Sequence, residues 1–237
     1  MLDGTRRGLE EPIAPGQERD AQSRERVLRK RDEHIEPSFT LAVHLTRTFG
    51  IASLIAALGV WLTLGTSAWL WLAMPVFWLV ANVFEWATHR YPMHQPLQPR
   101  VLYKKHAIIH HRAFTGQHQE IRQVQDLSLV MMPWYTLIII FSGASPIAVA
   151  AGLIGGPGLA GVFLVSAVGY FLLYELIHTL HHLPQAMLDR TRWGRSRALA
   201  SLRAHHHHHH QLEHMTKANF NVTFPFADKL LGTYVRS

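Results

Sequence analysis

Two long stretches of the sequence contain no lysine or arginine, and they limit the folds that the chain can adopt. Residues 48–87 contain a single acid, Glu85, and residues 127–177 contain a single acid, Glu175. All 23 Lys and Arg residues fall in residues 1–47, 88–126 or 178–237. Apolar helices of about 20 residues are long enough to cross a bilayer. The pattern therefore predicts an all-α, integral-membrane helical bundle.

The apolar stretches divide into four predicted transmembrane helices. Their approximate limits are residues 41–64, 69–87, 124–144 and 159–177. The sequence Gly155-Gly156-Pro157-Gly158 interrupts the last apolar run, so residues 146–154 are expected to form a short re-entrant or packing segment. Because the positive charges fall on one side of this topology, both termini are expected in the cytosol. The same rule places residues 88–123 and 178–237 in a cytosolic helical cap.

The first 38 residues differ in composition from the membrane domain predicted for residues 39–237. They hold 8 basic and 9 acidic residues, which predicts a polar, partly disordered cytosolic leader in which residues 18–35 can form an exposed helix. We assign this leader no chemistry. It lacks the apolar core of a secretory signal, so the first span is expected to direct membrane insertion. A bacterial inner membrane is favoured, and the ER membrane is expected if the source is eukaryotic.

The net positive charge belongs to the predicted cap. Residues 88–126 sum to +4 and residues 178–237 to +5, whereas residues 1–38 sum to −1. The sequence has no helix-turn-helix, zinc-finger or RNA-binding motif, which argues against nucleic acid as a partner. Lipid headgroups or an acidic electron-transfer protein are the expected partners of this surface.

Histidine occurs 18 times, whereas cysteine is absent. The absence of cysteine excludes disulfides, thiolate metal sites, iron–sulfur clusters and a cysteine nucleophile. Residues three or four apart share one helix face, so closely spaced histidines can direct two imidazoles to one metal. Four such groups adjoin the spans or lie in the cap: His89 and His94; His106, His110 and His111; His178 and His182; and His206, His209 and His210.

The number of clustered histidines indicates two metal ions. A zinc site uses three or four protein ligands, so nine or ten histidines are too many for one ion. Isolated His34, His44 and His118 are more typical of surface or capping positions and are left out. Within the run of six histidines at 205–210, spacing alone does not assign the ligands. His205, His207, His208 and His214 remain open as substitutes.

Two acids lie about one helical turn before predicted ligands. Glu85 precedes His89 by four residues, and Glu175 precedes His178 by three. Carboxylates in apolar spans are costly and are usually functional. We expect each to accept a ring N–H and so fix a ligand's orientation, with direct ligation or helix packing as the alternatives.

The order of these histidine groups, followed by NFNVTFPFADKLLGT from Asn219 to Thr233, resembles the fatty acid hydroxylase superfamily. That membrane-bound group includes sterol C4-methyl oxidases, sterol desaturases and sphingolipid fatty acid hydroxylases. The resemblance covers about residues 80–237. In the family a final His-x2-His-His precedes an NF-x-VT segment by about eight residues, as here, which selects the set His206, His209 and His210 from the six-histidine run.

The resemblance also bears on the other groups. The family pattern YE-x2-H-x3-H resembles the sequence around Tyr174, which selects His178 and His182 and leaves His181 as a bystander. In the second group three residues precede His110-His111, where some members have two. The choice of direct ligands among the group His106, His110 and His111 therefore stays open.

The resemblance implies a non-haem di-iron centre in a cytosolic cap above a four-helix stem. It implies hydroxylation of a C–H bond in a fatty acyl or sterol-like lipid, with dioxygen as oxidant. A separate ferredoxin-like or cytochrome-like donor, with its reductase, would then supply electrons. A desaturase or sterol oxidase on the same centre is the nearest alternative. Histidine-rich sites also bind zinc well, so isolated protein can carry zinc in place of iron.

A metal transporter is a remote alternative. A transporter would be expected to place polar ligands along a path through the bilayer. The predicted spans contain no histidine beyond their ends, apart from His44.

Overall fold

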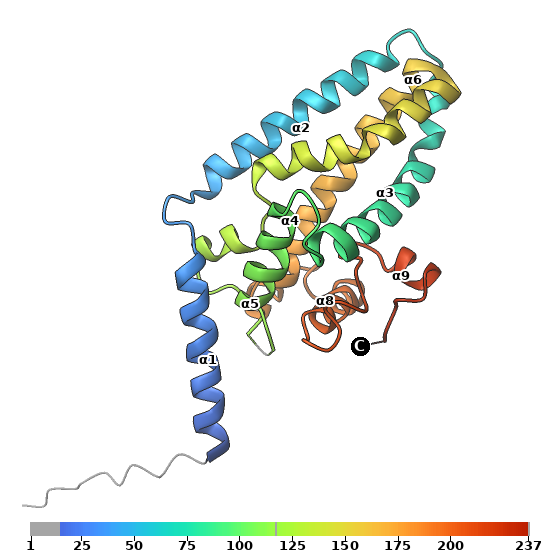
Figure 1. Ribbon diagram of the computed structural model, residues 1–237. Coiled ribbons are helices and arrows are strands. Elements are labelled where there is room, and N and C mark those ends of the chain that lie inside the picture. The colour runs from blue at the N-terminus through green and yellow to red at the C-terminus, as the bar shows by residue number, and fades with distance from the viewer. Residues whose placement is uncertain (1–14, 117, 237) are drawn as a thin grey trace, which may run out of the picture.

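The computed structural model describes residues 15–116 and 118–236. Helices are the regular elements of this part of the chain, in which no strand occurs, so the predicted all-α class is confirmed. Figure 1 shows an elongated stem of long helices with short cap helices gathered at one end. The elements are α1 Pro15–His34, α2 Leu41–Thr63, η1 Ala68–Ala73, α3 Met74–Thr88, η2 His89–Met93, α4 Val101–Tyr103, η3 Lys104–His110, α5 His111–Ala113, η4 Val124–Leu129, α6 Trp134–His182, α7 Gln185–Leu188, α8 Arg197–His209 and α9 Phe226–Leu230.

Three helical segments are long and apolar enough to cross a membrane. They are Leu41–Thr63, Ala68–Met93 and Val124–His182. Large apolar side chains on α2 point outward, with Leu54 73% and Trp61 65% exposed. Such exposure would be costly in water and is ordinary in lipid. These helices therefore associate with a membrane through their outer faces.

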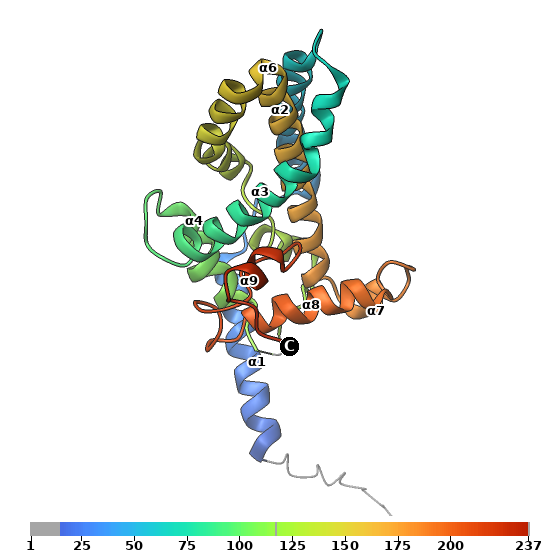
Figure 2. The ribbon, with the colours of Figure 1, turned by 90° about the vertical axis from the view of Figure 1, so that its right-hand side faces the viewer.

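The long helix α6 folds back on itself at two glycines. Gly155 and Gly156 have non-helical backbone angles, and Gly156 has a φ of 75°, which glycine adopts without steric cost. The two arms of α6 run side by side in both views of the ribbon (Figures 1 and 2). The predicted break at this point is present. The separate segment predicted for residues 146–154 was wrong, because those residues continue the first arm.

The start of this arm also differs from the sequence prediction. The third apolar helix was expected to begin near residue 124, but α6 begins at Trp134. Residues Val124–Leu129 instead form the 3-10 segment η4, in which Asp126 is fully buried. Composition did not separate the apolar residues Val124, Leu127 and Leu129 of this cap segment from the helix that follows.

The leader is more closely attached to the cap than its composition predicts. Helix α1 extends away from the stem, but its last turns pack on the cap, and Val27 and Arg31 are buried (Figure 1). The prediction of an exposed helix was therefore wrong for these turns. The predicted disorder of the leader falls largely on residues 1–14, which lie outside the described residues.

Glycine allows the two longest stem helices to approach closely. A Cβ placed on Gly59 of α2 would lie 2.9 Å from the carbonyl oxygen of Gly161 in α6. A Cβ on Gly161 would collide with the carbonyl oxygen of Gly59. Small residues at helix crossings let backbones meet and increase van der Waals contact in a membrane. The second arm of α6 is thereby fixed against α2, and this arm carries His178 and His182.

We predict that Gly161→Ala destabilises the stem, because the added methyl group must push two helix backbones apart. Overpacking of this kind costs about 1–3 kcal/mol. Thermal unfolding of the purified protein in detergent measures the effect. Gly143→Ala is the matched control in the same helix, since its nearest neighbour would be Phe84 Cζ at an ordinary 3.7 Å. Equal unfolding temperatures for the two variants would contradict a tight crossing.

Candidate metal centre

Two short π-helices carry the first two histidine groups. His89 begins η2, and His94 follows its last residue; His106 lies within η3, and His111 follows its last residue. Each pair is therefore five residues apart. A π-helix bonds residue i to residue i+5 and places them on the same side, whereas an α-helix does not. The π-helical winding directs both pairs inward.

This winding also accommodates the spacing of the second group. Three residues separate His106 from His110, and both lie within the π-helix η3. The wider turn of a π-helix lets His106 and the adjacent pair His110-His111 face the interior of the cap together. His106, His110 and His111 are all buried and all point toward other histidine rings.

The remaining predicted ligands come from the ends of α6 and α8. His178 and His182 lie in the last turns of α6, one helical turn apart. His206 and His209 lie on one face of α8, and His210 caps that helix. All five of these side chains are at most 2% exposed. Four separate chain segments thus deliver imidazoles to the interior of the cap.

The histidine side chains gather into two groups whose ligand nitrogens lie within 4.8 Å of one another. The first cluster is His89, His94, His106, His111 and His209, and the second cluster is His110, His182, His206 and His210. His178 lies beside the second cluster, with its Nε2 3.3 Å from Nε2 of His110. All ten predicted metal-ligand residues therefore meet at two adjoining places.

Backbone carbonyl groups fix the orientation of five of these rings. In the second cluster, the Nδ1 atoms of His110, His182 and His210 each face a backbone carbonyl oxygen. The distances are 2.8 Å from His110 to Leu129, 2.7 Å from His182 to Gln119 and 2.5 Å from His210 to Phe114. In the first cluster, Nδ1 of His89 forms a hydrogen bond with the Phe220 carbonyl oxygen. Nδ1 of His209 lies 2.8 Å from the Ala218 carbonyl oxygen. A carbonyl only accepts, so each Nδ1 carries the proton.

The opposite nitrogens of these neutral rings consequently present lone pairs to one another. His110 and His210 both donate from Nδ1, and their Nε2 atoms lie 3.2 Å apart. Two acceptors at this distance repel unless a cation lies between them. Metal–imidazole bonds of about 2.1 Å at right angles separate the two nitrogens by about 3.0 Å. The donor set thus fits metal ions.

Other pairs repeat the spacing. In the first cluster, Nε2 of His106 lies 2.7 Å from that of His89 and 3.1 Å from that of His111. In the second cluster, Nε2 of His206 lies 3.1 Å from those of both His182 and His210. Imidazole nitrogen suits iron, zinc, copper and nickel. The geometry of each cluster therefore suits a borderline transition metal.

Burial keeps the cluster rings uncharged. Desolvation lowers the pKa of His110 to about 4, and lowers the pKa values of His106 and His209 well below the ordinary 6.5. Neighbouring imidazoles act in the same direction, since each disfavours a second positive charge. Metal binding requires neutral histidine. The clusters are thus ready to accept cations near neutral pH.

The two buried acids have partners other than histidine. Glu85 accepts hydrogen bonds from the Tyr170 hydroxyl at 2.5 Å and from the backbone N–H groups of Val222 and Thr223 at 2.6 and 3.1 Å. Both oxygens of Glu175 face the N–H of Met132 at 3.3 Å. None of these bonds involves an imidazole, so the expected role in fixing the ligand tautomers was wrong. Backbone carbonyls perform it instead.

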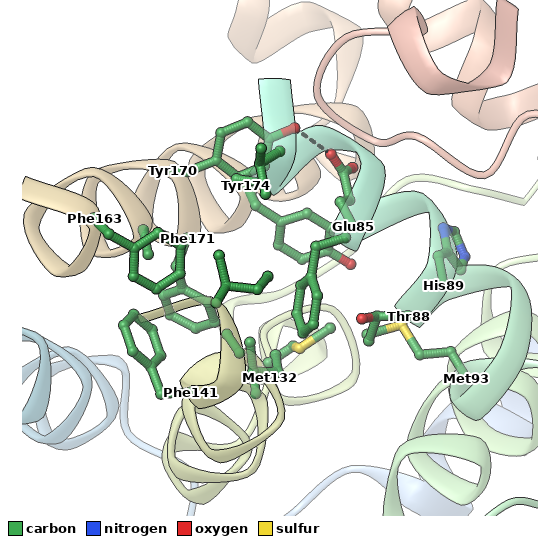
Figure 3. Close-up of a pocket in the computed structure, with 17 residues that line it drawn as sticks. Glu85, Thr88, His89, Met93, Met132, Phe141, Phe163, Tyr170, Phe171 and Tyr174 are labelled. Atoms are coloured by element: carbon green, nitrogen blue, oxygen red, sulfur yellow. Dashed lines mark hydrogen bonds between the residues drawn. The ribbon is translucent and has the colours of Figure 1, made fainter. Parts of the chain in front are cut away.

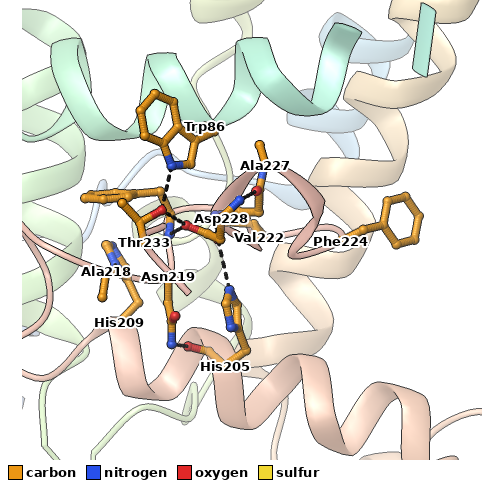
Figure 4. Close-up of polar contacts among 12 residues, drawn as sticks. Trp86, His205, His209, Ala218, Asn219, Val222, Phe224, Ala227, Asp228 and Thr233 are labelled. Carbon is orange, nitrogen blue, oxygen red and sulfur yellow. Dashed lines mark hydrogen bonds and ion pairs between the residues drawn. The ribbon is translucent and has the colours of Figure 1, made fainter. Parts of the chain in front are cut away.

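The C-terminal segment supports the first cluster through one carboxylate. Oδ1 of Asp228 accepts from the Phe220 N–H at 2.9 Å and the Thr233 hydroxyl at 2.7 Å, and Oδ2 accepts from the Asn221 N–H at 2.8 Å. His205 Nε2 lies 3.2 Å from Oδ2 (Figure 4). Although burial would raise the pKa of Asp228, these hydrogen bonds lower it below its usual range. Asp228 thus holds the Phe220 backbone that orients His89.

An apolar cavity leads from the stem to the first cluster. It lies between α3 and both arms of α6, and Figure 3 shows Phe141, Phe163 and Phe171 at one end and His89 with Met93 at the other. Its polar margin includes the Glu85–Tyr170 hydrogen bond. A hydrocarbon chain fits such a lining.

Comparison with protein families agrees with this geometry. A family model described as fatty acid hydroxylase matches residues 74–233, which include both clusters. The chain belongs to the fatty acid hydroxylase family. No curated protein and no solved structure gives a significant match. The match begins at α3, so α1 and α2 lie outside the part shared with the family model.

In this member of the fatty acid hydroxylase family, the histidines that were not predicted as metal ligands have other partners. His205 pairs with Asp228, Nε2 of His207 lies 2.9 Å from the His181 carbonyl oxygen, and His208 stacks on His214. His181 itself bonds the Val222 carbonyl and stacks on the second-cluster residue His206. Three further histidines lie outside both clusters: His44 in α2 beside Thr48, the exposed His34, and His118.

Sequence reasoning missed three residues that support the candidate metal centre: Asn82, Asp228 and Arg31. Asn82 of α3 bonds the tail at the Phe224 carbonyl and the Ala227 N–H. Asn82 could have been recognised from the sequence, because a polar amide within an apolar stretch is usually functional. Asp228 lies in the family-like tail, but nothing in its spacing indicates its four partners. Arg31 was missed as one of many charged residues in the leader.

We predict that the metal-free protein loses stability as the pH falls below neutrality. The cluster rings stay neutral when folded, whereas in the unfolded chain they bind protons below about pH 6.5. Stability is therefore full above that value and declines toward the folded-state pKa of His110, about 4. Thermal unfolding after chelation should show a fall of about 5 °C or more between pH 7.5 and 5.

The exposed His34 supplies the control for this measurement. His34→Gln should leave the decline unchanged, and His110→Gln should reduce it. An unfolding temperature that does not vary over this range would contradict buried, neutral clusters.

Proposed function

We propose that this chain is a membrane-bound di-iron oxygenase that hydroxylates a C–H bond of a fatty acyl or sterol-like lipid. Membership of the fatty acid hydroxylase family gives the broader function, an oxidoreductase of the membrane hydroxylase or desaturase type. The finer assignment is supported by the two histidine clusters and by the apolar cavity. Dioxygen is the proposed oxidant.

The observation that carries the proposal is the convergence of unprotonated Nε2 atoms at two adjoining clusters. Nine histidines in these clusters and His178 beside them are the proposed holders of two ions. Zinc has no redox chemistry, so oxidation of an unactivated C–H bond favours iron. When bound, two irons would supply the activation of dioxygen. The protein supplies the ligand geometry, the substrate site and the exclusion of water.

The cavity is the proposed site for the hydrocarbon chain. Its wall at Phe84 and Ile147 is shared with an apolar groove on the outer face of α3, which Val76 and Leu79 also line. A lipid can therefore approach laterally between α3 and the first arm of α6 without crossing water. The aromatic end would hold the chain, and the His89 end would present one carbon to the first cluster.

The polar margin of the cavity positions this first cluster. Glu85 holds the backbone at Val222 and Thr223, while the nearby Phe220 carbonyl holds the His89 ring. The Tyr170 hydroxyl donates its proton to the hydrogen bond with Glu85. We propose that these residues act by fixing the ligands and shaping the cavity, rather than by transferring protons.

Electrons would reach the centre from a separate protein. Residues 88–126 and 178–237 carry net charges of +4 and +5, and they form the cap that surrounds the clusters. An acidic ferredoxin-like or cytochrome-like donor, served by its reductase, fits this charge. With four crossings formed by α2, α3 and the two arms of α6, this cap and both termini lie in the cytosol by the positive-inside rule.

The proposed activity is tested by expressing the chain with host reductases and comparing lipid extracts with those from cells that express His209→Ala or His206→Ala. We predict an O2-dependent gain of one oxygen in a lipid, lost by at least about 100-fold in both variants, because each removes a metal ligand. His34→Gln is the control and should retain activity. A loss of two hydrogens would indicate desaturation instead; no wild-type product would overturn the proposal.

A second prediction concerns the cavity. Ala144 is buried in its wall, so Ala144→Trp should obstruct the hydrocarbon chain and lower lipid oxidation by about 10-fold or more, as loss of substrate positioning does. Metal content should stay at the wild-type value. Val149→Trp, at a position 61% exposed on the same arm, is the matched control and should remain active. Equal activities of the two variants would exclude this cavity as the substrate site.

A further inference from the structure

Arg31 of α1 is an arginine with an almost fully buried side chain, 1% exposed, in a helix whose neighbouring side chains are largely in solvent. Its Nε donates to the Ala113 carbonyl at 2.5 Å, its Nη1 to the Glu120 carbonyl at 2.7 Å, and its Nη2 to the His118 carbonyl. Asp126 Oδ2 lies 3.6 Å from Nη1. One guanidinium therefore ties three backbone carbonyls and a buried carboxylate together.

The backbone that Arg31 holds is the backbone that orients two metal-ligand rings. The Phe114 carbonyl accepts from His210, and the Gln119 carbonyl accepts from His182. The Arg31 guanidinium carbon also lies 4.3 Å from the centre of the Phe114 ring. Arg31 thus holds the residue before Phe114, the Phe114 ring itself and the residues on both sides of Gln119.

The third ring-orienting carbonyl of the second cluster lies on a segment that Arg31 also contacts. The Leu129 carbonyl accepts from His110 at 2.8 Å, and Leu129 ends the short segment η4. Asp126, the ion-pair partner of Arg31, lies in the same segment and is fully buried. All three carbonyls that orient rings of the second cluster therefore belong to segments attached to Arg31.

The first cluster is held differently. Its two ring-orienting carbonyls are those of Phe220 and Ala218, in the C-terminal segment. That segment is fixed by Asp228 and, through the Val222 N–H, by Glu85. Removing Arg31 should therefore disturb one cluster and spare the other.

We propose that Arg31 is a positioning residue for the metal of the second cluster, so that the leader helix α1 is part of the metal centre. This inference rests on the proposed two-metal site. It concerns a helix outside the residues that the family model matches. A planar guanidinium has the fixed fork needed to bind three carbonyls at once, which the single ammonium of lysine lacks.

The test is anaerobic titration of the chelated, detergent-purified full-length chain with Fe(II), read as bound iron per chain and as the affinity of each equivalent. We expect wild type to bind two equivalents. Arg31→Ala should weaken one of them by about 10- to 100-fold, the usual effect of losing a residue that orients a metal ligand. Arg29→Ala is the matched control, because Arg29 lies on the same helix with its side chain 74% exposed.

Ligand variants identify the equivalent affected. In a His206→Ala background, which damages the second cluster, Arg31→Ala should have no further effect on the remaining equivalent. In a His209→Ala background, which damages the first, it should weaken the remaining equivalent by the same 10- to 100-fold. A merely structural role of Arg31 would lower both equivalents in the otherwise wild-type chain and the remaining equivalent in each ligand-variant background.

Each failure has its own signature. One equivalent in wild type would contradict the two-metal proposal itself, whereas two unaltered equivalents in Arg31→Ala would overturn only the role of Arg31. Equal weakening of both sites would also overturn it. If Arg31→Ala does not fold, Arg31→Lys should show a smaller loss at the same single site, and wild-type affinities in Arg31→Lys would then overturn the inference.

Discussion

The lone pairs of buried, neutral imidazoles impose the constraint on which the cap of this protein depends. Nine histidine side chains place ligand nitrogens within 4.8 Å of one another in two clusters, with no cysteine in the chain to share the task. Backbone carbonyls hold the Nδ1 protons of several rings, which leaves the inward nitrogens without hydrogen. Such groups repel one another until cations are bound, so metal binding and cap stability are coupled.

The remainder of the chain supports this arrangement from three directions. The stem fixes the ends of α3 and α6 through the close crossing of α2 with α6, where Gly59 meets Gly161. The C-terminal segment, organised by Asp228, orients rings of the first cluster. The leader helix, through Arg31, holds the backbone that orients rings of the second. The apolar cavity opens toward the first cluster only at its His89 end. Glu85 and His89 are therefore shared between the support of the first cluster and the wall of the cavity.

Sequence reasoning succeeded where chemistry follows a period or a charge boundary. The uncharged stretches predicted apolar helices, the glycines at 155 and 156 predicted the turn within α6, and the histidine groups lie where the two clusters form. It failed where a role depends on distant backbone. Glu85 was expected to serve His89, one helical turn away, but it bonds the backbone at Val222 instead. Arg31 reaches carbonyls more than 80 positions along the chain, and nothing in its local sequence marks it. Long-range bonds to main-chain atoms leave no residue pattern to recognise.

The central claim is that each histidine cluster holds its own metal ion. Anomalous X-ray diffraction at the iron absorption edge, on crystals of the anaerobically reconstituted protein, tests it most directly because it locates ions without reference to activity. We predict two anomalous peaks, one among His89, His94, His106, His111 and His209 and the other among His110, His182, His206 and His210. A single peak, or peaks outside these side chains, would contradict the account.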